Sequence, residues 1–469
     1  MDMYRPIYHF IPGKNWMNDP NGVCWYQGKY HLFYQYNPYS DQWGNIHWGH
    51  AVSTDCVHWK ILPVALEPSA ERGEVHCFSG CVNTEGDQPI LYYTSVGKEA
   101  DGRDSRYGAE QWCALSENQM ESWSKYEGNP ILTKEIHGSL EVLEWRDPFV
   151  WREEDGWYMV LGGQIEGSGA VLLYYSSDRL EWKFCRVLLH SSNPAERIFE
   201  CPNYFALGEK RILVVSPDGM PKYWIGHEGK DHSFIPEKEG IIDHSGWDGF
   251  YAPNSFRDEC GRRIMIGWLT ENGRGNLEIP GWRGVQSLPR ELTLENGKLC
   301  MRPIRELETL RDEHIREESL VISGTWTSPL RGKAMEVLAE VVKADVEESL
   351  EIVLFADKDG TEETVIRYEK NADRVVIDRT RSNRSRLTDR KQLSCEEIFC
   401  EDKNLKLHIF VDYSTVEVFI NDCEVISTRA YPDDEKSDEV LLRSKKARIK
   451  KLDVYSLKGA NIETAENSR

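Results

Sequence analysis

The sequence has no long hydrophobic run and no excess of positive charge. No stretch approaches the ~20 consecutive apolar residues of a membrane-spanning helix. Acidic residues outnumber basic residues by 78 to 57, which gives a formal net charge of −21. A charge of this sign repels nucleic acid and anionic membranes alike, so we expect neither as a partner.

An export signal and a metal-binding cysteine pattern are also missing. The start, M-D-M-Y-R-P, has no basic segment followed by an apolar core. The twelve cysteines are scattered, and Cys77 and Cys81 have no second pair to complete a zinc pattern. We therefore expect most cysteines to be reduced core residues in a cytoplasmic protein. We also expect no metal and no cofactor.

Helical periodicity is scarce, and short strand patterns take its place up to about residue 300. In residues 30–36, Leu32 and Tyr34 fall on one face and Gln35 on the other. A serine, a turn and a tryptophan recur in 53–59, 116–123 and 177–182, at a spacing of roughly 60 residues. Five such units predict a five-bladed β-propeller. A β-sandwich with unrelated turns is the alternative.

The pattern changes after residue 300. Residues 303–310 begin with a proline suited to a first helical turn and place Leu307 and Leu310 on one stripe. Strand-like runs then return, the longest at 407–422, which indicates a β-sandwich. The predicted fold is all-β: a propeller over 1–300, a helical linker over 301–318, a β-sandwich over 319–459 and a polar tail over 460–469.

Three carboxylates lie in proline-bounded, aromatic-flanked segments. Asp19 lies in W-M-N-D-P-N-G, where the proline holds it in extended backbone and Asn-Gly favours a tight turn. Asp147 lies in E-W-R-D-P-F, and Glu200 lies in F-E-C-P-N. Asp19 alone reads as a turn residue that bonds its own backbone. The two further acids favour a catalytic group instead.

Six motifs in this order resemble a known family. They are W-M-N-D-P-N-G at 16–22, Y-Q-Y-N-P at 34–38, W-G-H-A-V-S at 48–53, F-S-G at 78–80, R-D-P at 146–148 and E-C-P at 200–202, with a hairpin at 410–422. With them the chain resembles the β-fructofuranosidases of glycoside hydrolase family 32, which include invertases, levanases, inulinases and sucrose-6-phosphate hydrolases. The resemblance covers almost the whole chain and implies a five-bladed propeller joined to a C-terminal β-sandwich.

The resemblance implies that Asp19 is the nucleophile, Glu200 the general acid/base and Asp147 the transition-state stabiliser. Cleaving a ketofuranosyl bond builds positive charge at the anomeric carbon, so an anion must face that carbon while a proton reaches the leaving oxygen. We expect negative neighbours to keep Glu200 protonated. Retention predicts carboxyl groups of Asp19 and Glu200 about 5 to 5.5 Å apart.

The other motif residues are interpreted as walls of a sugar pocket. Polar side chains offer hydrogen bonds to hydroxyls, and aromatic faces suit sugar carbons. Core packing is the alternative for the aromatic residues among them. The predicted substrate-binding residues are Asn18, Gln35, Trp43, Phe78, Ser79 and Arg146, with Trp16 and Tyr251 as additional candidates.

The chain departs from the family pattern at several positions. Asn203 stands where the family often has aspartate, and Gly249 replaces the aspartate of a common Asp-Phe-Tyr-Ala segment. Both changes remove negative charge from the expected rim of the site. Tyr413 and Cys423 replace residues that are commonly Arg and Gly, which we expect to affect packing.

The substrate is a small sugar, and its identity stays open at this level. Sucrose and short fructo-oligosaccharides are favoured. The loop 273–283 carries Arg274 and Arg283, which suit a sugar phosphate, or equally a solvated loop paired with the protein's own acids. The alternatives are a sucrose-6-phosphate hydrolase, a fructosyltransferase that uses the same acids, and a non-catalytic fructan-binding protein. The oligomeric state is open, a homodimer included.

Overall fold

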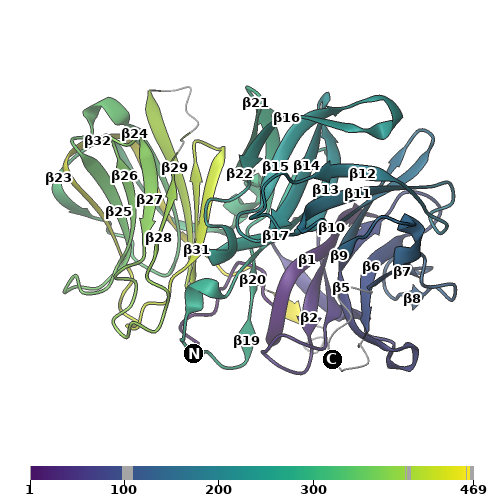
Figure 1. The fold of residues 1–469 in the computed structure, drawn as a ribbon. Helices are drawn as coiled ribbons and strands as arrows, with labels where there is room; N and C mark the ends of the chain where they lie inside the picture. The colour runs from purple at the N-terminus through teal and green to yellow at the C-terminus, as the bar shows by residue number, and fades with distance from the viewer. Residues whose placement is uncertain (1, 98–108, 397, 399–402, 461, 465–469) are drawn as a thin grey trace.

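The computed structural model describes residues 2–97, 109–396, 398, 403–460 and 462–464. These residues form two β-rich parts that lie side by side (Figure 1). Every helix among them is a short 3-10 helix. None of the described helices has the length and apolar character that crossing a membrane requires.

The first part is a five-bladed β-propeller, in which each blade is a mostly antiparallel sheet. The blades follow chain order, and each begins with its innermost strand. Their strands are β1 (Asn15–Tyr26), β2 (Lys29–Asn37), β3 (His47–Ser53) and β4 (Trp59–Leu66); β5 (Glu74–Asn83), β6 (Ile90–Gly97), β7 (Glu110–Leu115) and β8 (Ser124–Lys125); β9 (Leu143–Glu153), β10 (Gly156–Ile165), β11 (Ser168–Ser176) and β12 (Lys183–His190); β13 (Phe199–Leu207), β14 (Lys210–Pro217), β15 (Lys222–Glu228) and β16 (Phe234–Ile241); β17 (Phe250–Arg257), β18 (Arg263–Leu269), β20 (Val285–Gln286), β21 (Arg290–Glu295) and β22 (Lys298–Pro303).

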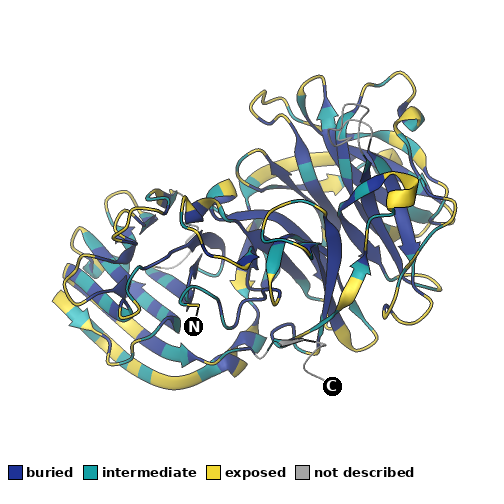
Figure 2. Cartoon of the chain, turned by 90° about the horizontal axis from the view of Figure 1, so that it is seen from below, coloured by how far each residue is buried: buried dark blue, intermediate teal, exposed yellow. Residues whose placement is uncertain are grey.

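Burial falls from the inner to the outer strands, as Figure 2 shows. The inner strand β1 is buried at most positions, whereas the outer strand β16 is mostly exposed. In β2 both faces are buried, because each face packs against a different neighbouring blade. The predicted alternation over 30–36 therefore separates two buried faces rather than an inside from an outside.

The repeated serine–turn–tryptophan segments join the third and fourth strands of the first three blades. In blade 1 the hydroxyl of Ser53 donates to Asp55, whose Oδ1 accepts the backbone N–H groups of Val57 and His58 at 3.0 and 2.8 Å. Blade 3 repeats this turn with Ser176, rather than Ser177, donating to Asp178. The repeat in the sequence therefore corresponds to a turn that recurs in successive blades.

The propeller ring closes through a two-residue strand. β19 (Trp282–Arg283) pairs in parallel with β1, matching Asn15 to Trp282, so the loop after β18 ties blade 5 to blade 1. At the outer edge of blade 1, β33 (Glu463–Thr464) pairs in parallel with β4. Part of the segment expected as a polar tail, 460–469, is therefore a sheet strand, and residues 465–469 lie outside the described part of the chain.

The second part is a nearly closed antiparallel β-sandwich. Its interior is a cluster of aliphatic residues that includes Val337, Ile352 and Leu442. Its strands are β23 (Arg311–Thr327), β24 (Ala334–Val342), β25 (Ser349–Ala356), β26 (Thr364–Glu369), β27 (Arg374–Asp378), β28 (Gln392–Cys395), β29 (Asn404–Asp412), β30 (Thr415–Ile420), β31 (Glu424–Arg429) and β32 (Glu439–Leu457).

The expected helical linker 301–318 is helical only over η6 (Arg305–Leu310). β22 extends to Pro303, and residues from Arg311 onward belong to β23, which pairs with β32. This distant pairing overrides the local helical pattern. The other 3-10 helices are η1 (Ala70–Arg72), η2 (Lys134–His137), η3 (Lys230–His232), η4 (Gly246–Asp248), η5 (Asn272–Arg274) and η7 (Lys343–Asp345).

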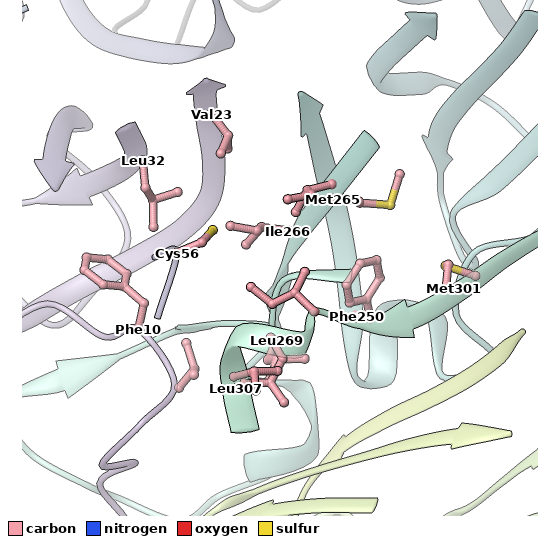
Figure 3. Packing of buried hydrophobic residues seen from close by; sticks show 14 of the residues in the cluster. Phe10, Val23, Leu32, Cys56, Phe250, Met265, Ile266, Leu269, Met301 and Leu307 are labelled. Atoms are coloured by element: carbon pink, nitrogen blue, oxygen red, sulfur yellow. The ribbon is translucent and has the colours of Figure 1, made fainter. Parts of the chain in front are cut away.

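A continuous hydrophobic core joins the two parts. Figure 3 shows Leu269 of blade 5 beside Leu307 of the linker helix, with Phe250 close to them. The same cluster includes Phe410 and Phe419 of the sandwich. The two parts therefore share an interior rather than touching through a polar surface.

Buried charges cross the same interface. The Arg290 guanidinium is fully buried and contacts Glu417 at 2.7 Å and Asp243 at 3.0 Å. His9 lies between Asp412 and Glu417, at 2.9 and 3.1 Å. Each buried charge thus has a partner of opposite charge, as burial in a medium of low dielectric requires.

The cysteines follow the sequence prediction with one exception. Eight of the described cysteines, Cys24, Cys56, Cys77, Cys81, Cys113, Cys185, Cys201 and Cys260, are free thiols, and all of these except Cys185 and Cys260 are buried. Cys300 of β22 and Cys423, in the turn between β30 and β31, form a disulfide between the propeller and the sandwich. The departure at Cys423 therefore adds a covalent link between the two parts.

Candidate active site

Asp19, Asp147 and Glu200 lie on the innermost strands of blades 1, 3 and 4, near the start of each strand. At each acid the strand pairing is irregular, with register shifts at 17–20 in β1, next to residue 147 in β9 and at 200–203 in β13. The prolines explain these shifts, because proline has no N–H to donate to the ladder. At these irregular positions the side chains of Asp19 and Asp147 come together at the thiol of Cys201, next to Glu200.

Asp19 is held by a closed ring of neutral hydrogen bonds. Its Oδ2 accepts from the Ser79 hydroxyl at 2.6 Å, and its Oδ1 accepts from the Asn18 amide at 3.0 Å. Gln35 closes the ring, because it accepts from Asn18 at 3.0 Å and donates to Ser79 at 2.8 Å. Trp16 fixes the Asn18 amide by donating to its oxygen at 2.8 Å.

Asp147 lies deeper, with 5 % of its surface exposed. Its Oδ2 accepts the backbone N–H of Cys201 at 2.9 Å, and its own N–H donates to the Thr94 hydroxyl at 2.9 Å. The Cys201 sulfur lies 3.6 Å from Asp147 Oδ2 and 3.8 Å from Asp19 Oδ2. One thiol therefore touches both carboxylates, and Glu200 is its neighbour in the chain.

Glu200 faces a cation and a phenol. Arg146 donates to Glu200 Oε1 through Nη2 at 2.7 Å and Nε at 3.1 Å. Tyr251 donates to Oε2 at 2.7 Å. Arg146 also pairs with Glu144. Glu200 keeps 24 % of its side-chain surface exposed, so its carboxylate is accessible.

Burial shapes the electrostatics of the two aspartates. It raises the pKa of Asp19 to about 6, while the Ser79 and Asn18 hydrogen bonds act in the opposite direction. Burial also raises the pKa of Asp147 to about 7, with Arg146 opposing and Glu200 adding to the rise. The expectation that negative neighbours keep Glu200 protonated stays a prediction. A cation also faces this carboxylate, since Arg146 lies 2.7 Å from it.

Aromatic side chains surround the acids on two sides. On one side Trp43 is 41 % exposed and lies edge-on to Phe78, with ring centres 6.2 Å apart. The alternative that Trp43 is a core residue is therefore excluded. On the other side, Trp16 contacts Trp268 at 6.1 Å between ring centres.

The wall continues to a tryptophan at the surface. Trp247, 45 % exposed, contacts Trp268 at 5.7 Å and Tyr251 at 4.4 Å. Sequence reasoning missed Trp247 and Trp268. The only signal for Trp247 was its position four residues before Tyr251, and Trp268 looked like an ordinary strand residue.

The loop 273–283 does not present both arginines to the pocket. Arg274 is 2 % exposed and donates to the carbonyl oxygens of Leu277 and Ile279, at 2.9 and 2.5 Å. It also pairs with Glu271 at 3.2 Å. Arg283 lies 3.5 Å from Glu278. Arg274 therefore stabilises its own loop, and the description of a solvated loop does not apply to it.

The departures at residues 203 and 249 lie away from the rim. Asn203 is fully buried, donates to the carbonyl oxygens of Cys201 and Pro253, and accepts the Ser255 N–H at 2.8 Å. It joins blades 4 and 5. Gly249 has no room for a side chain, since a Cβ atom would lie 2.2 Å from the Ser427 carbonyl oxygen. Neither position could therefore present a charged side chain at the surface.

One metal-like group occurs among the described residues, away from the acids: His244, Cys395 and Glu424. His244 bonds Glu424 at 2.8 Å, and the Lys298 ammonium also pairs with Glu424. The lysine supplies the positive charge that a metal would bring, so this group has the character of an ion-pair cluster.

Comparisons with known proteins agree over nearly the whole chain. The family model described as "Glycosyl hydrolases family 32 N-terminal domain" matches residues 9–303, and "Glycosyl hydrolases family 32 C terminal" matches residues 306–456. Two relatives are a sucrose-6-phosphate hydrolase of Escherichia coli, 34 % identical, with 94 % of this chain and 92 % of the relative covered, and a levanase of Bacillus subtilis, 33 % identical, with 97 % and 70 % covered.

A solved structure gives the same result. The GH32 β-fructofuranosidase BmSUC1 of Bombyx mori superposes with a TM-score of 0.82 at 29 % identity, covering 98 % of this chain and 95 % of that chain. A variant of BmSUC1 has been solved in complex with sucrose.

Proposed function

The chain belongs to glycosyl hydrolase family 32, and from this we infer that it is a β-fructofuranosidase that releases terminal β-D-fructofuranosyl residues from sucrose or short fructo-oligosaccharides. We propose that Asp19, Asp147 and Glu200 perform the reaction with retention of configuration. One observation carries this assignment: Asp19 and Asp147 both contact the thiol of Cys201, the residue next to Glu200.

In the proposed first step, Asp19 attacks the anomeric carbon of the fructosyl group. The ring of Asn18, Gln35 and Ser79 prevents the carboxylate from rotating, so the attacking oxygen stays in place. A carbon–oxygen bond forms to Asp19 as the glycosidic bond breaks. Glu200 gives its proton to the leaving oxygen, and a covalent fructosyl-Asp19 intermediate results.

In the proposed second step, Glu200 takes a proton from water, and the water oxygen attacks the anomeric carbon and displaces Asp19. Arg146 and Tyr251 orient Glu200 through both carboxyl oxygens. For Glu200 to act first as an acid, the bound sugar must exclude water from it and loosen the Arg146 pair, because both changes favour the protonated carboxyl.

Asp147 is proposed to bind hydroxyl groups of the fructosyl ring. Its Oδ2 accepts from the Cys201 N–H and its other oxygen is left for sugar hydroxyls, which suits an acceptor that strengthens its hydrogen bonds as positive charge develops on the ring. Trp43 and Phe78 provide apolar faces at one rim, and Trp247 provides one at the other.

The test is to incubate the purified protein with sucrose, sucrose 6-phosphate, kestose and inulin, and to identify every released sugar. With methanol added, a retaining enzyme forms methyl β-D-fructofuranoside, whereas an inverting enzyme forms the α anomer. Asp19→Asn should lower kcat by about 10⁴-fold or more. The control Asp87→Asn changes a carboxylate that is 97 % exposed and should leave kcat unchanged. Full activity of Asp19→Asn would refute the assigned nucleophile.

Sucrose-6-phosphate hydrolysis is the second candidate, since one relative at 34 % identity carries that name. The burial of Arg274 gives this candidate no support. Released glucose 6-phosphate at a higher kcat/KM than released glucose would favour it. A fructosyltransferase would instead give longer oligosaccharides at high sucrose concentration.

The cytoplasmic location stays a prediction. The eight free thiols named above support a reducing compartment, and the Cys300–Cys423 disulfide points to an oxidising one. Thiol counting on protein isolated from its native host would separate the two.

A further inference from the structure

The propeller has a cavity at the end opposite the acids. Four of the five innermost strands carry an acid or Tyr251 in their first half, whereas the last residues of all five line a cavity of about 470 Å³. This volume is within the range of about 300–1,000 Å³ that is typical of small-molecule sites. The lining includes Trp25, Asn83, Tyr204 and Arg257, each from a different blade.

The cavity holds cations without partners in a strongly acidic protein. Arg257 and Arg263 stand directly opposite each other on β17 and β18. Neither forms an ion pair or a side-chain hydrogen bond with any residue that the structure describes, and the same holds for Arg152 at the cavity's edge. Like charges facing each other across a strand pair destabilise a sheet. The chain has a net charge of −21 and many acids that could pair with these arginines, so their unpaired state indicates a bound anion.

The acids of the cavity do not neutralise these arginines. Glu153 pairs with Arg211 at 2.7 Å, and Arg211 also pairs with Glu228 at 2.5 Å. The remaining acid, Glu85, is exposed. Arg263 stacks over the Phe205 ring at 4.3 Å, which fixes the plane of its guanidinium. Burial, and next the charge of Arg257, lower the pKa of Arg263 to about 10.

Three buried polar groups in the same cavity lack hydrogen-bond partners among the described residues. They are Asn83 Oδ1, Tyr204 OH and Ser255 Oγ, on side chains 4 %, 2 % and 3 % exposed. A buried polar atom without a partner costs about 1–3 kcal/mol. Two of these groups are hydroxyls that can donate, and Asn83 Oδ1 can only accept, so a ligand that satisfies all three carries both oxygen acceptors and hydroxyl donors.

We propose that this cavity binds a small hydroxylated anion, a polyol bearing one phosphate or carboxylate group, with the anionic group between Arg257 and Arg263 and the hydroxyls on Asn83, Tyr204 and Ser255. Planar guanidinium groups match the oxygens of phosphate and carboxylate through paired hydrogen bonds. The inference goes beyond the proposed hydrolysis, because this cavity lies at the other end of the innermost strands. None of the residues that line it belongs to the candidate active site.

Calorimetric titration with glycerol 3-phosphate, gluconate and uncharged glycerol tests the proposal, with saturating fructose present to occupy the other site. We expect one or both anions to bind with Kd below about 1 mM and glycerol not to bind. Arg257→Gln and Arg263→Gln should each weaken anion binding at least tenfold, which is about 1.4 kcal/mol. Arg331→Gln is the matched control, since it changes an exposed arginine of the sandwich that pairs with Asp438.

Arg257 is exposed, so Arg257→Gln should fold even if Arg263→Gln does not. Without ligand its Tm should equal or exceed that of the wild type, because one of two facing like charges is gone, while the Tm gain on adding anion is lost. The proposal is overturned if neither anion binds the wild type, if both arginine variants bind as the wild type does, or if glycerol binds equally well.

Discussion

At Asp19, burial opposes the negative charge while hydrogen bonds from Ser79 and Asn18 stabilise it. The resulting pKa of about 6 places the ionisation of the proposed nucleophile inside the working range of an enzyme. Below that pH a growing fraction of Asp19 is protonated and cannot attack. The acid limb of kcat/KM therefore reports directly on this hydrogen-bond ring.

Ser79→Ala removes one of the bonds that favour ionised Asp19, so the pKa of Asp19 should rise. We expect the acid limb of the kcat/KM profile for sucrose to move upward by about 0.5–1 pH unit. The control Ser53→Ala removes a hydroxyl from a blade turn and should leave the limb in place. An unmoved or lowered acid limb in Ser79→Ala would contradict the role of this bond.

Asp147 gives a prediction about stability. Its pKa in the fold is about 7, against 3.8 in the unfolded chain. Between these values the native state binds the proton and the unfolded state does not, so the free energy of unfolding falls as pH rises from about 4 to about 7. Asp147→Asn should therefore stabilise the protein by about 1–3 kcal/mol at pH 8, with little effect at pH 4.

Urea unfolding at both pH values measures this difference, and Asp87→Asn again serves as the control. A destabilised Asp147→Asn variant at pH 8 would show that the carboxylate is stabilised in the fold. Its activity should nevertheless be lost, because the proposed stabiliser is missing. Removal of a buried catalytic charge is expected to raise the stability of the fold and to lower the activity.

The acids could be proposed from local sequence because each lies one or two residues before a proline, which disturbs the strand pairing. Trp247, Trp268 and the thiol of Cys201 could not, since their positions follow from contacts between blades. The burial of Arg274 could not be predicted either, because its partners are carbonyl oxygens of its own loop. Local chemistry predicts the charged centre, and tertiary contacts decide which side chains surround it.

At the scale of elements, strands with regular alternation and serine turns were predictable, whereas β23 was not. Residues 311–318 carry a charged pattern with no strand signature, and they become a strand because β32, more than 120 residues later, pairs with them along its length. Pairing at such separation leaves no trace within a local window.

Gly284 provides a test of how strand contacts position the site. Its φ is +83°, and a Cβ atom there would lie 1.7 Å from the Met17 carbonyl oxygen, two residues before Asp19. Gly284→Ala should cost more than about 3 kcal/mol and, where folded protein is obtained, lower kcat by about 10²-fold because β1 shifts.

The matched control is Gly297→Ala, which has φ +71° and no atom within 4 Å of the added Cβ. This variant should lose only the free energy of unfolding that the left-handed conformation costs an alanine, about 1–2 kcal/mol. Its kcat should not change. Urea unfolding and sucrose kinetics on both variants make the comparison. Equal losses of stability in the two variants would show that β1 moves away from the added methyl group at Gly284 without a measurable cost.

For the whole molecule, the shared core and the buried charges make the propeller and the sandwich one cooperative unit. Arg290→Gln leaves Asp243 without its cation and Glu417 with His9 alone, both in a fully buried place. Removal of one partner from a buried pair should cost about 3–5 kcal/mol. The exposed control Arg331→Gln should cost less than about 1 kcal/mol.

Differential scanning calorimetry should show a single transition for the wild type and a lower single transition for Arg290→Gln. Two separated transitions in the wild type would show that the interface does not couple the parts. A loss below about 1 kcal/mol in Arg290→Gln would show that the network is not a main determinant of stability.

The ring closure by β19 and β1 has a consequence for specificity. Because the acids come from three blades, their spacing depends on the circumference of the ring rather than on any loop. Surface hairpins can lengthen or shorten without altering that circumference. Which sugars enter can therefore diverge widely among proteins that keep the same reacting geometry.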